Sequence, residues 1–232
     1  MVRPQPIIAI DGPVSAGKST LARELAHQMS YTYLNTGAMY RAVAIAARAA
    51  GISPDDLAID AQLKPMLDRI KIEFDGERVT LDGTDVSREI SAPAVSELAS
   101  KLSALTVVRD RMRDLQREAG KSGGVVMEGR DIGTVIFPDA EVKFFLDADV
   151  NVRADRRYKE LQAKGDPVTR GEVLAQLIER DRRDSAREHA PLKRADDAIT
   201  IDATKLTVEE CVALMKAHIE QRINAGKGLK RA

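Results

Sequence analysis

The chain has 232 residues, and 36 basic side chains balance 36 acidic ones, which argues against binding to nucleic acid or an anionic membrane through bulk charge. Hydrophobic residues make up 44%, too many for a disordered protein, and the single cysteine, Cys211, excludes an internal disulfide framework and a cysteine-cluster zinc site. No apolar run approaches the ~18 residues of a membrane span and the segment MVRPQPIIAI lacks a secretory hydrophobic region, so we expect a soluble, cytoplasmic globular protein.

Short apolar runs alternate with helical patterns along most of the chain. Each run is bounded by Gly, Pro, Asp or Glu, which is typical of strands buried in a parallel sheet. The predicted strands are residues 7–10, 125–127, 142–146 and 198–201, with 31–34 as a weaker candidate. Helical patterns cover residues 19–30, residues 38–50 and a final segment that contains Val208, Val212 and Met215. This alternation predicts an α/β fold with a parallel sheet.

Two blocks depart from that rhythm. In residues 52–120, the turn signals Asp75-Gly76 and Asp82-Gly83 flank alternating residues, which predicts a small antiparallel hairpin, and helical patterns follow over 91–105 and 107–119. We interpret this block as a lobe inserted into the sheet domain. Residues 151–197 contain many acidic and basic side chains, nine of which are arginines. These residues either have a functional role or form a solvated helical face with ion pairs.

A phosphate-binding motif follows the first predicted strand. The segment IIAIDGPVSAGKST contains Gly12, Gly17, Lys18 and Ser19 in the spacing G-x-x-x-x-G-K-[ST], between an apolar run and an amphipathic helix. In this motif, backbone N–H groups and the helix N-terminus bind phosphate, the lysine reaches the β- and γ-phosphates, and the hydroxyl binds Mg²⁺. The sequence therefore predicts binding of a nucleoside triphosphate.

Other residues narrow the use of that nucleotide. The guanine-reading sequence N-K-x-D of GTPases is absent, which argues against a GTPase. The apolar run VVMEGRD ends in acidic residues, as the corresponding run of a motor ATPase does, so a motor ATPase is only partly excluded. A small-molecule kinase needs a second pocket, in which arginines grip an anionic acceptor. Arg41 and Arg130 follow predicted strands, and the i, i+4, i+7 spacing places Arg180, Asp184 and Arg187 on one predicted helical face.

The chain resembles bacterial cytidylate kinases over residues 7–222. The segments that carry the resemblance, in the family's order, are GPVSAGKST, LNTGAMYRAVA, EGRDIGTVIFPDAEVKFFLDA, RRYKELQAKG, ERDRRDSAREHAPL and ADDAITIDAT. The resemblance implies a P-loop NTPase fold with a five-stranded parallel sheet flanked by helices, an inserted NMP-binding lobe and a helical lid. It further implies that the γ-phosphate of ATP passes to CMP, and to dCMP, with Mg²⁺ as cofactor.

In domain terms, the resemblance implies a single kinase domain over residues 1–232. Its core would comprise 5–50, 121–150 and 190–223, its inserted lobe about 52–120 and its lid about 151–189. We expect residues 153–170 of the lid to close over ATP.

The resemblance also implies roles for individual residues. Those expected to hold the ATP phosphates are Gly12, Pro13, Val14, Ser15, Ala16, Gly17, Lys18, Ser19 and Thr20. Those expected to bind CMP are Thr36, Arg41 and Arg130 at its phosphate, Ser100, Arg109 and Asp131 at the cytosine edge, and Arg180 and Asp184 at the ribose. Arg187 is expected at the phosphates during transfer, with the lid arginines Arg153 and Arg157.

Two positions depart from the family pattern. Thr36, which also suits the N-cap of a helix, stands where the family often has Ser, and the hydroxyl is kept. Ser15 stands where the family often has Gly, so a positive φ there would cost about 1 kcal/mol.

Several alternatives stay open at this point. The chain could be another nucleoside-monophosphate kinase, acting on UMP, AMP or dTMP, or a P-loop regulatory protein that has no phosphoryl acceptor. An RNA-binding module is disfavoured by the zero net charge and by 3% aromatic residues. We expect nucleotides as small-molecule partners, no nucleic-acid or membrane partner, and a monomer. The tail GKGLKRA is expected to be disordered.

Overall fold

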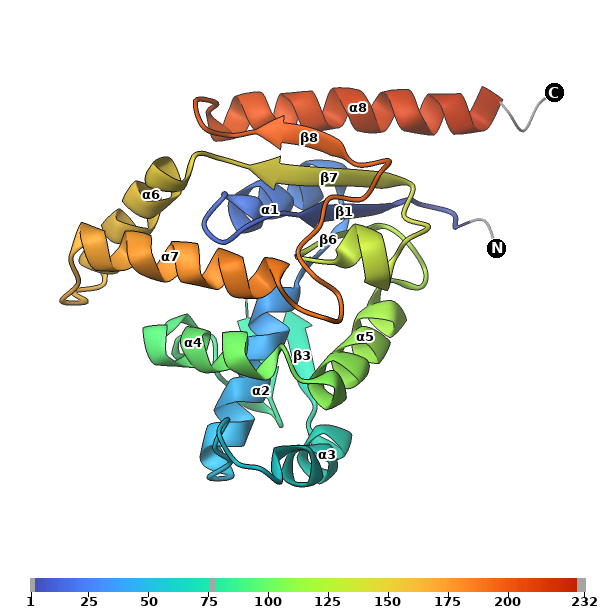
Figure 1. Ribbon diagram of the computed structural model, residues 1–232. Helices are drawn as coiled ribbons and strands as arrows, with labels where there is room; N and C mark the ends of the chain where they lie inside the picture. The colour runs from blue at the N-terminus through green and yellow to red at the C-terminus, as the bar shows by residue number, and fades with distance from the viewer. Residues whose placement is uncertain (1–2, 76–77, 229–232) are drawn as a thin grey trace. The chain divides into compact units, whose positions relative to one another are not determined.

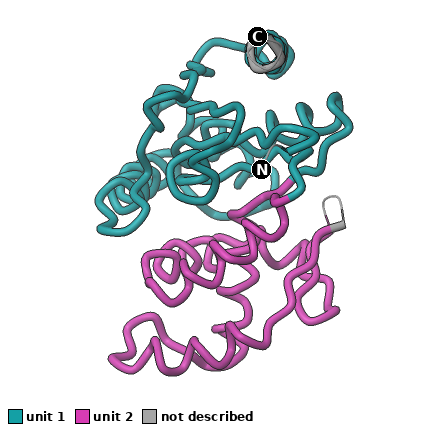
Figure 2. The backbone as a smooth tube through the Cα atoms, turned by 90° about the vertical axis from the view of Figure 1, so that its right-hand side faces the viewer, with its two compact units in different colours: residues 1–33, 122–232 teal, residues 34–121 magenta. Residues whose placement is uncertain are grey.

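The computed structural model describes residues 3–75 and 78–228, and the chain divides into two compact units. One unit comprises residues 1–33 and 122–232, and the other comprises residues 34–121 (Figure 2). The two units are described in turn because each has its own sheet and its own hydrophobic core.

A five-stranded sheet organises the first unit, with strand order β2-β6-β1-β7-β8 (Figure 1). Its strands are β1 (Ile7–Asp11), β2 (Thr32–Asn35), β6 (Val125–Gly129), β7 (Val142–Asp147) and β8 (Ile199–Asp202). The β1 strand pairs in parallel with β6 and β7, and β7 pairs in parallel with β8. Every residue of β1 and β6 is buried, which is why these two strands lack polar alternation. The predicted parallel α/β sheet is confirmed, including the weaker candidate β2.

Helices α1 (Lys18–Met29) and α8 (Val208–Gly228) pack against each other and share a core with the sheet. Leu21 and Leu25 of α1 meet Phe144 of β7 and Met215 of α8 in this core, as the helical spacing predicts. Cys211 is buried in the same core. Helix α8 continues through Gly228, so the predicted disorder is wrong for residues 226–228, and residues 229–232 lie outside the described part of the chain.

The charge-rich block forms two helices, α6 (Val150–Ala163) and α7 (Arg170–Ser185), which lie side by side (Figure 1). Ala154, Leu161, Val173 and Leu177 make a small apolar core between them. Helix α7 begins with a capping box, in which the Thr169 hydroxyl accepts from the N–H of Glu172.

The second unit contains α2 (Thr36–Ala49), α3 (Ile59–Arg69), α4 (Pro93–Leu102) and α5 (Thr106–Gly120) around a core of their own. A small antiparallel sheet joins β3 (Ile72–Asp75), β4 (Arg78–Leu81) and β5 (Thr84–Asp85). The predicted hairpin is thus part of a three-stranded sheet. Asp82 and Gly83 both have positive φ and turn the chain from β4 into β5. The other predicted turn, at Asp75-Gly76, extends beyond the described residues.

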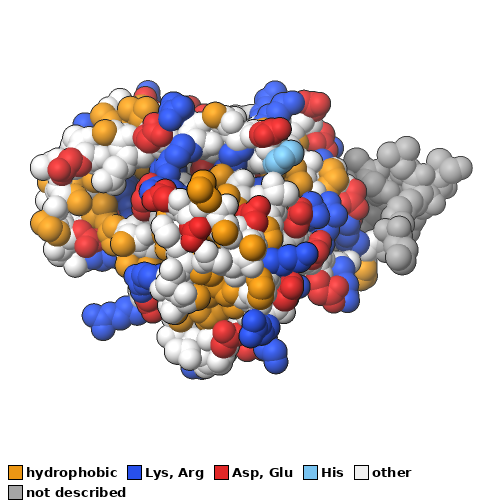
Figure 3. All heavy atoms as spheres, turned by 60° about the horizontal axis from the view of Figure 1, so that its bottom comes forward, with side chains coloured by type: hydrophobic (Ala, Val, Ile, Leu, Met, Phe, Trp, Pro, Cys, Tyr) orange, Lys and Arg blue, Asp and Glu red, His pale blue; other side chains and the backbone are white. Residues whose placement is uncertain are grey.

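The second unit begins at Leu34, within strand β2, and the predicted inserted block 52–120 lies inside it. Helix α2 belongs to this unit because its Met39, Val43 and Ala47 are buried in the same core as α3, α4 and α5. No helix among the described residues is long and apolar enough to cross a membrane. Figure 3 shows basic and acidic side chains interspersed over the face that it presents, in keeping with the zero formal net charge.

Candidate active site

The predicted phosphate loop connects β1 to α1. Gly12 has φ +151°, and a Cβ there would lie 2.0 Å from the carbonyl oxygen of Leu146, so this position requires glycine. Gly17, with φ +101°, caps the start of α1. Ser15 has φ +60°, which is the left-handed conformation considered for it from the sequence. The loop therefore holds roughly 1–2 kcal/mol of strain at Ser15 that a glycine would not carry.

Lys18 is buried, and its Nζ donates to the carbonyl oxygen of Pro13 at 2.5 Å. Burial, together with the nearby Arg130 guanidinium, holds the pKa of Lys18 well below its usual value, against the opposing charges of Glu128 and Asp11. The lysine thus stands inside the phosphate loop among groups of both signs.

Asp11, at the end of β1, joins the phosphate loop to the segment that follows β6. Its two carboxylate oxygens accept hydrogen bonds from the backbone N–H groups of Ile132 and Gly133, each at 2.8 Å. Those two residues open a single π-helical turn, Ile132–Ile136, next to the predicted site residues Arg130 and Asp131. Burial raises the pKa of Asp11 to about 7, although both backbone donors oppose the rise. Sequence reasoning assigned Asp11 no role, although an acid at the end of a buried strand was a usable signal.

Arg130, Asp184 and Arg187 form one cluster in the first unit. The Arg130 Nε lies 2.9 Å from Asp184 Oδ2, and Arg187 pairs with the other oxygen of the same carboxylate. Burial acts to raise the pKa of Asp184, but the charges of Arg130, Arg187 and Arg180 outweigh it and lower the value. Asp184 thus pairs with Arg187, which the predicted spacing placed near it, and with Arg130, a partner that the spacing did not indicate.

The predicted helical face is wrong in one respect, because α7 ends at Ser185 and the chain has left the helix at Arg187. Arg187 pairs with Asp184 from beyond the helix end.

Helix α6 contacts the phosphate loop through two arginines. Arg153 is buried and donates to the carbonyl oxygen of Val14 at 3.1 Å and to Asp181 at 2.5 Å. Asp181 in turn accepts from the Val14 N–H at 3.3 Å. Arg156, which sequence reasoning did not select, donates to the carbonyl oxygens of Ala16 at 3.4 Å and Ala203 at 2.6 Å. The third arginine of this helix, Arg157, pairs with Glu160.

The remaining predicted residues lie in the second unit. Thr36 is the first residue of α2 and is buried, and the preceding Asn35 caps the helix by accepting from the N–H of Ala38. The N-cap is therefore Asn35, and the prediction of Thr36 as the N-cap is wrong.

Other predicted side chains of this unit lie on α2, α4 and α5. Arg41 donates to Ser96 Oγ at 3.2 Å, and Arg109 donates to the carbonyl oxygen of Ser103 at 3.2 Å. Ser100 is buried, and among the described residues its Oγ has no hydrogen-bond partner. An unsatisfied buried hydroxyl is costly, so Ser100 Oγ is suited to a polar ligand.

The predicted acceptor-site residues thus divide between the units. Thr36, Arg41, Ser100 and Arg109 belong to the second unit, and Arg130, Asp131, Arg180, Asp184 and Arg187 belong to the first. Asp131 is buried, and its charge contributes to the raised pKa of Asp11.

Within the described residues, no group of three or more His, Cys, Asp or Glu side chains is arranged to hold a metal ion. Mg²⁺ at kinase sites is commonly held by one or two protein oxygens together with substrate phosphates and water. Ser19 at the start of α1 is the predicted protein ligand.

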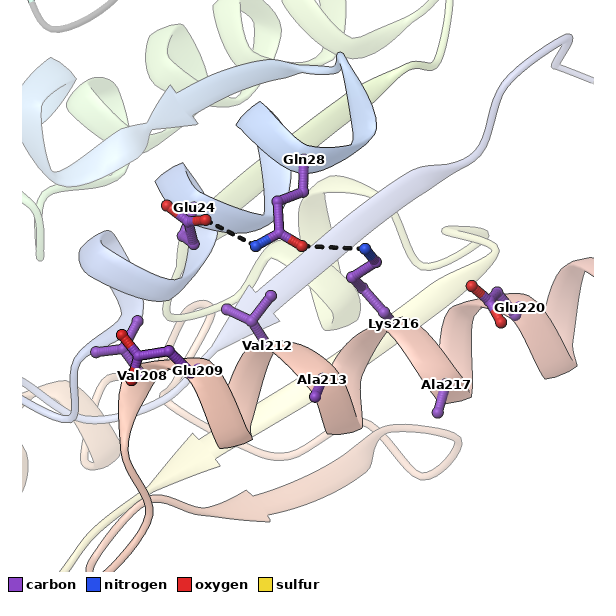
Figure 4. A pocket seen from close by; sticks show the side chains of 9 residues that line it. All are labelled: Glu24, Gln28, Val208, Glu209, Val212, Ala213, Lys216, Ala217 and Glu220. Carbon is purple, nitrogen blue, oxygen red and sulfur yellow. Dashed lines mark hydrogen bonds between the residues drawn. The ribbon is translucent and has the colours of Figure 1, made fainter.

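A separate groove of about 510 Å³ lies between α1 and α8 (Figure 4). Its lining includes Glu24 and Gln28 of α1 and Lys216 of α8, with Gln28 Oε1 accepting from Lys216 Nζ at 3.0 Å. The groove lining contains none of the residues predicted for the active site.

The chain is similar to known proteins over nearly its whole length. The sequence model of the family described as cytidylate kinase matches residues 8–221. The chain is 51% identical over 222 residues to a cytidylate kinase of Geobacter sp. strain M21, covering 95% of each chain. It is 50% identical over 226 residues to a cytidylate kinase of Geobacter sulfurreducens, covering 96% of each.

A solved structure of an uncharacterized protein from Eubacterium ventriosum shares the fold. Its TM-score is 0.51 at 15% identity, with 93% of this chain and 99% of that one covered. With a family match that spans nearly the whole chain, and relatives about half identical to it, this chain belongs to the cytidylate kinase family.

Proposed function

We propose that this protein transfers the γ-phosphate of ATP to CMP, and to dCMP, by direct in-line transfer that forms ADP and the nucleoside diphosphate. The proposal rests on the presence of two features in the first unit. One is a phosphate loop with a buried Lys18, and the other is the Arg130–Asp184–Arg187 cluster. The cytidylate kinase family membership of the chain selects CMP among the possible acceptors.

The acceptor atom is a phosphate oxygen of CMP that is already anionic near neutral pH, so the reaction needs no strong general base. Catalysis then consists of positioning the two phosphates and stabilising the charge on the transferring group. Lys18 supplies a buried positive charge on the donor side, and a triphosphate beside it would favour its protonated form. Bound Mg²⁺, held by the nucleotide phosphates and Ser19 Oγ, supplies further charge neutralisation.

The arginines are proposed to hold the acceptor phosphate and the transferring group. Arg41 and Arg130, with Thr36, bind the CMP phosphate, and Arg187 reaches the transferring group. Asp184 already binds Arg130 and Arg187 in this structure, so these guanidinium groups are ordered before an anion arrives. Arg180 and Asp184 contact the ribose in this proposal.

Cytosine recognition is proposed for Ser100, Arg109 and Asp131. Cytosine offers an amino donor beside two acceptors, so a carboxylate can accept from the amino group while an arginine and a hydroxyl donate to the acceptor edge. Uracil carries a carbonyl in place of the amine and would face Asp131 without a donor. In the part of the chain that the structure describes, the buried Ser100 hydroxyl has no hydrogen-bond partner, which supports this assignment.

Residues 151–189 are proposed to act as a lid that excludes water from ATP, with 153–170 closing over the nucleotide. In support, Arg153 and Arg156 of α6 already contact backbone carbonyls of the phosphate loop, and α6 and α7 pack as one pair. We expect slower hydrogen exchange in 153–170 when a bisubstrate analogue binds. Unchanged exchange there would contradict closure.

The remaining parts of the proposal concern the setting of the reaction. We propose that the protein works in the cytoplasm as a monomer. Sedimentation of the purified protein with and without nucleotides would test the oligomeric state, and a mass of twice the chain would contradict it.

The primary experiment measures ADP formation from Mg-ATP with CMP, dCMP, UMP, AMP and dTMP in turn. Turnover led by CMP is expected. Faster turnover with another monophosphate would show that this compound, and not CMP, is the acceptor. A rate of ADP formation that is the same with and without every monophosphate would indicate a P-loop regulatory protein.

A further inference from the structure

Val14, within the phosphate loop, is held by helices α6 and α7 through three contacts. Its carbonyl oxygen accepts from Arg153 Nη1 at 3.1 Å, and its N–H donates to Asp181 Oδ1 at 3.3 Å. Its side chain packs against the small apolar core between the two helices. All of these residues belong to the first unit. Contacts from outside the loop therefore fix the position of this loop residue.

Arg153 and Asp181 are themselves held in place. Arg153 Nε donates to the carbonyl oxygen of Ala148 at 2.9 Å, and Arg153 Nη1 lies 2.5 Å from Asp181 Oδ2. Because Arg153 is buried, the Asp181 carboxylate compensates a guanidinium that has little access to water. Asp181 thus supports both backbone contacts of Val14, one directly and the other through Arg153.

The residue that follows Val14 is the strained one. Ser15 has φ +60°, a left-handed conformation that is unfavourable for a serine. Such a conformation persists only where the surrounding structure holds it. The Val14 carbonyl and the Ser15 nitrogen share one peptide plane, so the contact with Arg153 restrains the rotation that would relieve the strain. On the other side of Ser15, Arg156 donates to the carbonyl oxygen of Ala16 at 3.4 Å.

We propose that Asp181 is a positioning residue for ATP, which holds Val14 so that the phosphate loop keeps its strained conformation at Ser15. The N–H groups of such a loop bind phosphate together only when the backbone holds them on one concave side. A loop that relaxes before the nucleotide arrives must be ordered again on binding, which lowers the affinity. The inference rests on the proposed function, because ATP is the ligand proposed for this loop.

The test compares Asp181→Ala with Glu179→Ala, which removes an acidic side chain from the same helix. Glu179 is exposed and pairs with two arginines of its own helix. Calorimetric titration with a non-hydrolysable Mg–ATP analogue, without CMP, measures binding in the absence of turnover. We expect Asp181→Ala to weaken binding about tenfold, as the loss of one hydrogen bond to a charged group predicts, and Glu179→Ala to match wild type.

A double variant separates positioning of the loop from a general structural effect. Glycine adopts a left-handed φ without the strain that a serine carries. Adding Ser15→Gly to Asp181→Ala should therefore tighten binding of the analogue about twofold to fivefold relative to Asp181→Ala alone. Binding that is no tighter in the double variant would overturn the proposal.

CMP binding is the second readout, because neither Val14 nor Asp181 is assigned to the acceptor site. The affinity for CMP, measured without ATP, should be the same in Asp181→Ala and in wild type. Equal weakening of CMP and analogue binding would overturn the proposal, as would unchanged analogue affinity in Asp181→Ala. Tighter analogue binding in that variant would show that the carboxylate repels the phosphates, and would also overturn it.

Asp181→Asn keeps the proposal testable if the alanine variant does not fold. Its amide oxygen can accept from the Val14 N–H, but it has no charge to pair with Arg153, so we expect a smaller loss of analogue affinity than in Asp181→Ala. Affinity equal to that of wild type would overturn the proposal. If the wild-type enzyme bound no analogue, the proposed function would fail as well, which distinguishes the two failures.

Discussion

Replacing Asp11 by asparagine tests the connection between the phosphate loop and the segment that follows β6. Burial raises the pKa of Asp11 from 3.8 to about 7. The folded chain therefore binds this proton more tightly than the unfolded chain does. The resulting stability is fully present below pH ~4 and is lost as the pH rises toward 7. A difference of about three pKa units between the folded and unfolded chain, at ~1.4 kcal/mol per unit, corresponds to about 4 kcal/mol in the free energy of unfolding.

Asparagine cannot titrate, and its amide nitrogen would face one of the two backbone donors that Asp11 now binds. Asp11→Asn should therefore be less stable than wild type at pH 4.5, and the gap in unfolding free energy should narrow or reverse by pH 7.5. Urea denaturation followed by far-ultraviolet circular dichroism at several pH values measures this gap.

Asp202→Asn is the matched control for this experiment. Asp202 ends β8 of the same sheet but is exposed, and hydrogen bonds from Thr204 lower its pKa. Its titration lies below this pH range, so its gap from wild type should stay level. A gap for Asp11→Asn that is equally level from pH 4.5 to 7.5 would refute the reasoning.

Three further variants test other parts of the site. Ser15→Gly should stabilise the protein by ~0.5–1 kcal/mol in urea denaturation, because it removes ~1–2 kcal/mol of left-handed strain and adds ~0.4–1 kcal/mol of unfolded-chain entropy; a loss of stability would show that the loop needs the serine. Asp131→Asn should lower the ratio of kcat/KM for CMP over UMP by about tenfold, equivalent to one charged hydrogen bond, whereas equal loss with both substrates would exclude cytosine reading. Asp184→Asn leaves Arg130 and Arg187 without their shared carboxylate and should lower the free energy of unfolding by about 3 kcal/mol. Sulfate should raise the free energy of unfolding more for Asp184→Asn than for wild type. An equal rise in both proteins would argue against an anion site at these arginines.

Local pattern was sufficient for the sheet and for the phosphate loop. The strands β1, β6 and β7 could be predicted because burial on both faces demands unbroken apolar runs. The loop could be predicted because phosphate binding requires glycine, lysine and a hydroxyl at set spacing along the chain. Both signals lie within a few consecutive residues.

Elements with weak local signals were missed or misplaced. Helix α3 was not predicted, although Leu63 and Leu67 share one buried face, because Pro65 lies within it. The strand β5 has only two residues, too few for an alternating pattern, and it forms by pairing with β4. The helical face proposed for Arg187 ignored the end of α7.

The sequence by itself thus determined the parallel α/β fold, the phosphate loop and, through whole-chain similarity, the family. Only the tertiary structure revealed that Asp11 binds the N–H groups of Ile132 and Gly133, that Arg156 reaches the carbonyls of Ala16 and Ala203, and that the Tyr33 hydroxyl donates to Glu128. In the first and last of these contacts, residues about a hundred positions apart meet because β1 and β2 each lie beside β6. Such partners leave no periodicity in the sequence, since they are chosen by strand order and not by spacing along the chain.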